Sequence, residues 1–149
     1  KLLQKKLNAD NSITALEESL SKLGIDKQEY VLVDASGLSR HNLVTPKVLV
    51  QSLSVMAKSK HSHNYQASLA VAGKNGTLKK RFLDTSVSGN LWAKTGTLTG
   101  VGTLAGYLDV ANYETLVFSI IINNSDLSSK EIRQVIDEIV ILLSQLQHC

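Results

Sequence analysis

The first third of the chain combines one stretch of helical periodicity with one short apolar run. Apolar residues recur every three or four positions behind a polar Asn-Ser pair: Ile13, Leu16, Leu20 and Leu23. This spacing predicts an amphipathic helix over residues 12–23, which ends at Gly24. Residues 30–34 are short, apolar and rich in β-branched side chains, so they predict a strand.

The middle of the chain predicts a second helix, a loop and a short third helix. Thr45 is an N-cap residue and Pro46 fits the first helical position, so we expect a helix over residues 45–58. Its apolar stripe consists of Leu49, Leu53 and Met56. Residues 60–64 are polar and rich in histidine, which predicts a loop, and a glycine turn precedes an expected short helix over residues 77–82.

The second half of the chain has the pattern of a small sheet. Three apolar runs occur at residues 91–98, 103–110 and 116–123, and their short links favour an antiparallel meander. Ser128 and Glu131 then match a capping box. The helix that follows has a broad apolar stripe: Ile132, Val135, Ile136, Ile139, Val140, Leu143 and Leu146. We therefore expect an α+β fold, an antiparallel sheet of about three strands covered by a C-terminal helix, with helices before it.

Composition limits the possible functions. The 149 residues, 43% of them hydrophobic, fit one compact domain. A net charge of +3, with its basic residues spread along the chain, does not indicate nucleic-acid binding. The single cysteine, Cys149, excludes an internal disulfide. The sequence starts at Lys1 without a signal peptide or an apolar run of membrane-spanning length, so we expect a fragment or a processed product.

The run Lys94-Thr95-Gly96 is the strongest chemical signal. This tripeptide accompanies a nucleophilic Ser-x-x-Lys in penicillin-binding proteins and serine β-lactamases. Acyl transfer needs a cation beside the serine hydroxyl, a hydroxyl for a carboxylate and a backbone N–H for the oxyanion. Lys94, Thr95 and the N–H of Thr97 are the candidates for these roles. Glycines here and in the next strand suggest close approach of a ligand, and Lys94 and Thr95 should leave opposite faces of the strand.

Five segments in order give this signal its context: Asp34 to Asn42 followed by Thr45-Pro46, Ser68 to Gly73, Asn75 to Leu78, Lys94 to Gly100, and Leu104 to Tyr107. With these motifs the chain resembles the C-terminal part of class C low-molecular-mass penicillin-binding proteins. That family contains D-alanyl-D-alanine carboxypeptidases and endopeptidases of the cell envelope. The resemblance extends from the first predicted helix to the last.

The resemblance implies the rest of our expectations. Residues 1–149 would be the C-terminal portion of a transpeptidase-like domain shared with serine β-lactamases. The parent would act on peptidoglycan stem peptides and β-lactams through an acyl-enzyme, without metal or cofactor, in the periplasm or outside the cell. The family's Ser-x-x-Lys and Ser-x-Asn would both precede Lys1, so the isolated chain should be inactive. It should pair with the rest of the domain, or with a second copy, along an exposed edge of residues 91–98.

The segment from Asp34 to Asn42, which we call the motif loop, adds a candidate substrate subsite. Arg40 could hold a carboxylate on the third residue of the stem peptide, as in diaminopimelate. A structural ion pair with Asp34 or Asp84 is the alternative for this arginine. Leu38 and Leu98 could line the apolar part of the same subsite, although ordinary packing is also open for Leu98.

Other matches to catalytic motifs are weaker. Ser19 and Lys22 fit Ser-x-x-Lys, but Lys22 should lie on the solvated side of its helix. Ser62-His-Asn64 and Ser88-Gly-Asn90 fit Ser-x-Asn without facing a cleft. His61 and His63 lack a third metal ligand nearby. Two other functions stay open, a β-lactamase or esterase relative and an inert binding or assembly module.

Overall fold

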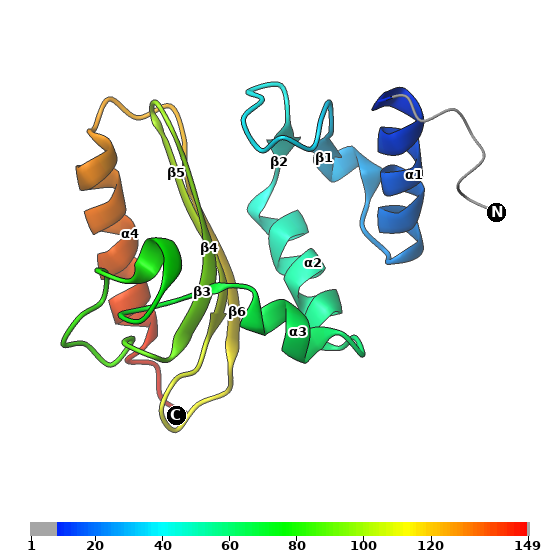
Figure 1. Cartoon of the computed structure of the whole chain (residues 1–149). Coiled ribbons are helices and arrows are strands. Elements are labelled where there is room, and N and C mark those ends of the chain that lie inside the picture. Colours follow the sequence, from blue (N-terminus) through cyan, green and yellow to red (C-terminus); the bar gives the residue numbers. More distant parts are fainter. Residues whose placement is uncertain (1–8, 149) are drawn as a thin grey trace.

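The computed structural model describes residues 9–148, which form a helical part followed by a sheet with helices on both sides (Figure 1). In chain order the elements are α1 (Ala9–Lys22), η2 (Lys27–Glu29), β1 (Tyr30–Val31), β2 (Leu43–Val44), α2 (Pro46–Ala57), α3 (Ser62–Ala67), β3 (Ala70–Val71), η3 (Gly76–Leu78), β4 (Leu91–Leu98), β5 (Val101–Leu108), β6 (Leu116–Ile122) and α4 (Ser129–Leu143). Helices and antiparallel strands in these proportions confirm the α+β class.

The main sheet has the strand order β3-β4-β5-β6, and all its pairs are antiparallel. β4 and β5 form a hairpin in which Leu98 faces Val101. Gly100, with φ +73°, takes the left-handed conformation that this tight connection needs. The link between the two strands is therefore shorter than the sequence predicts, and β5 covers Val101–Leu108 instead of residues 103–110.

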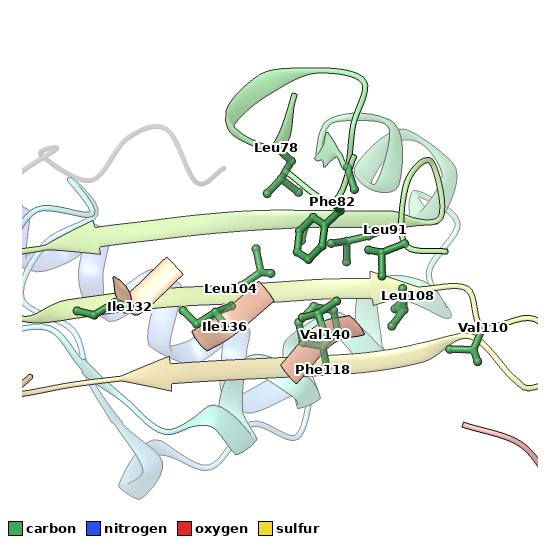
Figure 2. Close-up of a cluster of buried hydrophobic side chains, with 13 residues drawn as sticks. Leu78, Phe82, Leu91, Leu104, Leu108, Val110, Phe118, Ile132, Ile136 and Val140 are labelled. Carbon is green, nitrogen blue, oxygen red and sulfur yellow. The ribbon is translucent and has the colours of Figure 1, made fainter. Parts of the chain in front are cut away.

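The side of the sheet that faces α4 holds the main core (Figure 2). Leu91 and Leu104 from the strands and Ile136 and Val140 from α4 are at most 1% exposed. Alternation along the strands produces this apolar face. The Ser128 hydroxyl accepts from Glu131 N–H and the Glu131 carboxylate accepts from Ser128 N–H, which confirms the predicted capping box. The predicted C-terminal helix thus covers the sheet, although it ends at Leu143.

The opposite side of the sheet packs against α2 and α3. Leu53 of α2, Leu69 and Tyr107 of β5 form a second buried cluster, with Tyr65 of α3 beside it. The Tyr107 hydroxyl donates to the Leu53 carbonyl at 2.8 Å. Thr45 caps α2 by accepting from Val48 N–H, as its sequence position predicts. The sheet is thus a middle layer, and either face can present side chains to a site.

Two predicted segments are wrong. Residues 60–64 were expected to be a loop, but most of them belong to α3, which is stabilised by the edge-to-face contact of Tyr65 with Tyr107 at 6.5 Å. The helix expected over residues 77–82 is only the 3-10 turn η3. Phe82 has φ +62°, so its left-handed backbone ends any helix there and turns its ring into the core.

The strand expected over residues 30–34 is also shorter, because side chains replace a strand partner. β1 pairs with β2 for two residues only. Beyond it, the Asn42 side-chain oxygen accepts from the N–H groups of Val33 and Asp34 at 2.7 and 3.2 Å. The motif loop thus holds its backbone with its own polar groups. None of the helices within residues 9–148 has the length and apolarity needed to cross a bilayer.

Candidate active site

β4 presents the Lys-Thr-Gly run with alternating orientation. Ala93 belongs to the core under α4, whereas Trp92 packs with the cluster on the α2 side. Because side chains alternate along a strand, Lys94 points to the α2 side and Thr95 to the α4 side. The expectation that these two side chains leave opposite faces agrees with the fold.

One edge of β4 is free beyond its first residues. β3 pairs only with Trp92 and Ala93, and β5 occupies the other edge along the whole strand. Within the described part of the chain, no strand pairs with residues 94–98 on the β3 side. The predicted exposed edge is therefore correct for residues 94–98 and wrong for the start of the strand, which the unpredicted β3 covers.

Lys94 lies at the mouth of a cavity between the sheet and the helices α2 and α3. The cavity has a volume of about 290 Å³ and is lined by Lys94, Ser52 and Tyr65, among others. The Lys94 side chain is exposed, and its ammonium donates to the carbonyl of Thr95 at 2.6 Å. The Lys94 ammonium has three N–H donors, so it can also donate a hydrogen bond to a group bound in the cavity.

Thr95 faces a second, smaller cavity on the α4 side. This cavity of about 130 Å³ lies between β4 and α4 and is also lined by Thr97, Arg81 and Arg133. The hydroxyls of Thr95 and Thr77 lie 3.0 Å apart, with Thr95 as donor. Arg81 forms an ion pair with Asp137 of α4, which ties the segment after η3 to the helix. The hydroxyls of Thr95 and Thr97 in β4 thus line the same cavity as the guanidinium groups of Arg81 and Arg133.

The glycines around the strand have neighbours within the protein. Gly96 faces Thr103 across the β4–β5 pair, and a Cβ at residue 96 would overlap the Thr103 hydroxyl. A Cβ at Gly102 would overlap Ile132 of α4, and one at Gly106 would overlap the backbone of Trp92. These positions require glycine for packing, so the glycines by themselves do not indicate a ligand.

The motif loop places Arg40 beside the far end of the same strand. Its guanidinium donates to the carbonyl of Thr99 in the β4–β5 turn at 3.1 Å. Among the described residues it forms no ion pair with Asp34 or Asp84. The Asp34 carboxylate instead accepts from the hydroxyl and backbone N–H of Ser36, which lowers its pKa. The structural ion pair considered for Arg40 is therefore absent from residues 9–148.

Arg40 and Leu98 line a third cavity of about 260 Å³, between the motif loop and the sheet. Leu38 is 72% exposed and does not line this cavity, so the fold brings together two of the three predicted subsite residues. Leu98 is only partly buried, which leaves it accessible from the cavity.

The weaker motif matches do not form a site. The Ser19 hydroxyl donates to the Ala15 carbonyl within α1, and Lys22 is exposed, as predicted. His61 and His63 are exposed. No group of three or more histidine, cysteine, aspartate or glutamate residues that could hold a metal ion occurs within residues 9–148.

Sequence reasoning missed the polar residues that surround β4 from other elements. These are Thr77, Arg81 and Arg133 on the α4 side and Ser52 and Tyr65 on the α2 side. Their sequence distance from Lys94 ranges from 13 to 42 positions. No local motif marks them, so only the tertiary structure could bring them to the strand.

The arrangement is that of the serine β-lactamase and penicillin-binding protein fold. A structure of an extended-spectrum β-lactamase superposes with a TM-score of 0.62 and 22% identity, covering 88% of this chain and 52% of the β-lactamase chain. This match indicates a shared fold. Penicillin-binding protein 4 from Haemophilus influenzae matches with a TM-score of 0.81 and 31% identity over 90% of this chain and 32% of its own.

Sequence comparison defines the family. The profile of the D-Ala-D-Ala carboxypeptidase 3 (S13) family matches residues 3–146, and the chain belongs to this family. It is 41% identical over 137 residues to penicillin-sensitive carboxypeptidase A of Dictyostelium discoideum, covering 87% of this chain and 26% of that protein. A D-alanyl-D-alanine carboxypeptidase from an Actinomadura species is 42% identical over 119 residues, covering 76% of this chain and 22% of that protein. The chain thus spans about a quarter of the length of these relatives.

Proposed function

We propose that this chain is the C-terminal portion of the catalytic domain of a serine-type D-Ala-D-Ala carboxypeptidase or endopeptidase. The observation that carries the proposal is the Lys94-Thr95-Gly96 run on the free edge of β4, with an open cavity on each side. Family membership over residues 3–146 supports it. The substrates are peptidoglycan stem peptides, and penicillins react as acylating analogues.

The reaction follows the order of serine acyl transfer. A serine oxygen from the remainder of the protein attacks the carbonyl carbon of the terminal amide, and its proton passes through a base to the leaving nitrogen of D-alanine. The C–N bond breaks and leaves an acyl-enzyme. Water then attacks the ester carbonyl, which releases the shortened peptide and restores the serine hydroxyl. No metal or organic cofactor is needed.

Residues of β4 supply charge and hydrogen bonds for these steps. Lys94 stabilises the serine network and its developing negative charge from the α2 side. The Thr95 hydroxyl binds the terminal carboxylate, and the N–H of Thr97 donates to the oxyanion. Gly96 leaves room for the Thr103 side chain in the neighbouring strand.

Arg40 recognises a second carboxylate of the peptide. Its bond to Thr99 uses one of the five N–H donors of the guanidinium, and the others can bind a carboxylate on the third residue. Leu98 supplies an apolar wall of the same cavity. Arg40→Gln should therefore raise KM for a peptide with this carboxylate more than for one without it.

The outer face of α4 supports the proposal that the chain completes its fold with other parts of the parent. Three apolar residues of this helix, Val135, Ile139 and Leu142, are 39%, 37% and 65% exposed. Exposed apolar stripes of this kind are normally covered by a partner element. The free edge of β4 is the second place for pairing. A second copy of the chain is the alternative partner, which sedimentation as a dimer would indicate.

The test uses the full-length protein and the isolated chain in parallel. The full-length protein should release D-alanine from a peptide ending in D-Ala-D-Ala and should become covalently labelled by a fluorescent penicillin. The isolated chain should do neither, because the serine lies elsewhere. Stoichiometric labelling of Ser19 in the isolated chain, or no D-alanine release by the full-length protein, would contradict the proposal. Membership of this family supports a location of the parent in the cell envelope, which fractionation would test.

A further inference from the structure

The Thr95 hydroxyl is held by a residue from another element of the fold. It donates to the Thr77 hydroxyl of η3 at 3.0 Å, and the two residues are 18 positions apart in the chain. Thr77 is exposed and Thr95 is only partly buried. A hydrogen bond between neutral groups that water can reach contributes little to stability, because water offers each group a similar partner. Folding alone therefore does not explain why η3 brings a hydroxyl to this point of β4.

The backbone on both sides of Thr77 is fixed by packing. Gly76 has φ +54°, and a Cβ at this position would lie 2.9 Å from the Cβ of Ala70 in β3. Leu78 is completely buried and points into the main core (Figure 2). The Leu78 carbonyl also accepts from the N–H of Gly73 at 3.0 Å. Thr77 thus has a defined position beside β4.

The segment after η3 is anchored as well. Arg81 forms an ion pair with Asp137 of α4, and its guanidinium lies 5.4 Å from the centre of the Phe82 ring. Phe82 itself is 6% exposed and belongs to the main core. A hydroxyl on a segment that is already ordered can orient its neighbour without an entropic cost when a ligand binds. Thr77 meets this condition.

The hydrogen-bonding capacity of the two hydroxyls suits a carboxylate ligand. Each hydroxyl has one donor and two acceptor lone pairs, and the Thr95 donor is directed to Thr77. A carboxylate only accepts, so Thr95 has to turn its proton toward a carboxylate that binds there. The Thr77 hydroxyl can then donate to the Thr95 oxygen. The result is a chain from Thr77 through Thr95 to the carboxylate, in which each bond strengthens the next.

We propose that Thr77 is a positioning residue, which orients the Thr95 hydroxyl toward the terminal carboxylate of the substrate. This inference rests on the proposed function and adds a residue of η3 to it. A threonine side chain has three staggered rotamers, and the bond to Thr77 selects one of them for Thr95. Without this bond the Thr95 side chain has to be ordered when the substrate binds, so substrate affinity falls. Because Thr77 acts only through Thr95, the chemical step is unchanged.

The experiment measures D-alanine release by the full-length protein from a peptide that ends in D-Ala-D-Ala. Thr77→Val keeps the branched shape of the side chain and removes its hydroxyl. We expect this variant to raise KM about fivefold and to leave kcat within about twofold of the wild-type value. Thr77→Ser keeps the hydroxyl and should return KM to within about twofold of the wild-type value. An unchanged KM for Thr77→Val, or no recovery by Thr77→Ser, would overturn the proposal.

Thr95→Val tests whether Thr77 acts through Thr95. Alone it should raise KM more than Thr77→Val does, because it removes the direct contact with the carboxylate. Adding Thr77→Val to this variant should then change KM by less than about 1.5-fold, since the group that Thr77 orients is already absent. If the two effects multiply, Thr77 acts independently of Thr95 and the proposal is wrong.

Thr115 provides the matched control. Its exposed hydroxyl also makes a hydrogen bond to a side chain, donating to the Asp109 carboxylate at 2.6 Å. It lines none of the three cavities along β4. Thr115→Val should leave KM and kcat unchanged, and Thr77→Val should unfold within about 1 °C of the wild-type temperature. An equal rise in KM for both variants, or a clearly lower unfolding temperature for Thr77→Val, would show a structural role and overturn the proposal.

The same measurements separate this inference from the proposed function. If the wild-type protein releases no D-alanine and is not labelled by a fluorescent penicillin, the proposed function is wrong. If it is active and Thr95→Val raises KM but Thr77→Val does not, only the role of Thr77 is wrong. If it is active and Thr95→Val leaves KM unchanged, the roles of both threonines are wrong and the enzymatic activity stands.

Discussion

Gly96→Ala is a substitution whose effect can be worked out from the structure and that separates packing from ligand binding. A Cβ at residue 96 would overlap the Oγ1 atom of Thr103 across the β4–β5 pair. Overpacking of this kind costs about 1–3 kcal/mol, and alanine in place of glycine in a strand recovers about 0.5–1 kcal/mol. We expect a net loss of about 1 kcal/mol in the free energy of unfolding.

Thr103→Ala removes the atom that the new methyl group meets. The double variant Gly96→Ala with Thr103→Ala should therefore be more stable than the sum of the single effects predicts, by about 1 kcal/mol. Thermal unfolding of the full-length protein measures this, because 1 kcal/mol corresponds to a shift of about 2–4 °C for a domain of this size. Additive single effects would show that the Thr103 side chain is not the reason why residue 96 must be glycine.

Penicillin labelling of the same variants separates the two reasons for a glycine. If only packing requires Gly96, the double variant should recover both its unfolding temperature and its labelling rate. Recovered stability with persistent loss of labelling would mean that a ligand, too, approaches the strand at this position.

Two further predictions concern the polar contacts that hold the layers together. Arg81→Gln leaves Asp137 without its partner, and we expect it to lower the free energy of unfolding by about 2 kcal/mol. Adding Asp137→Asn should recover part of this loss. No recovery would show that the two residues are not coupled. Burial raises the pKa of Tyr107 to about 12, whereas an exposed tyrosine ionises near about 10. The contribution of Tyr107 to the free energy of unfolding should therefore be fully present below about pH 10 and fall by about 2 kcal/mol between about pH 10 and pH 12. Tyr107→Phe should show a smaller fall over this range in denaturant titrations, and an equal fall would contradict the role of Tyr107.

The sequence predicted those elements that depend on interactions between residues close together along the chain. The capping box of Ser128 and Glu131, the Thr45-Pro46 start of α2 and the alternation of residues 91–98 all depend on neighbours along the chain. The orientation of Lys94 and Thr95 follows from that alternation. Because each of these features is local, the amino-acid sequence alone is enough to predict it.

Elements that depend on distant contacts could not be predicted. β3 has only two residues, which is too short for a periodic pattern in the sequence. It is defined by its pairing with Trp92 and Ala93 of β4. α3 depends on the packing of Tyr65 against Tyr107. Arg81 reaches the site because Asp137, 56 positions away, anchors it to α4.

The roles of the site residues stay predictions, and the sequence indicated only which strand would carry them. The motif located Lys94 and the residues beside it, but the cations that share their cavities, such as Arg133, come from elements without a motif of their own.

If Lys94 takes part in serine acyl transfer, its removal from the full-length protein should slow acylation without unfolding the protein. We predict that Lys94→Ala slows labelling by a fluorescent penicillin about 100-fold or more, because one preorganised electrostatic contact contributes about that much. Lys22→Ala, an exposed lysine of α1, serves as the matched control. Both variants should unfold at the wild-type temperature, since the Lys94 side chain is exposed. Labelling of the Lys94→Ala variant at the wild-type rate would show that Lys94 takes no part in acyl transfer.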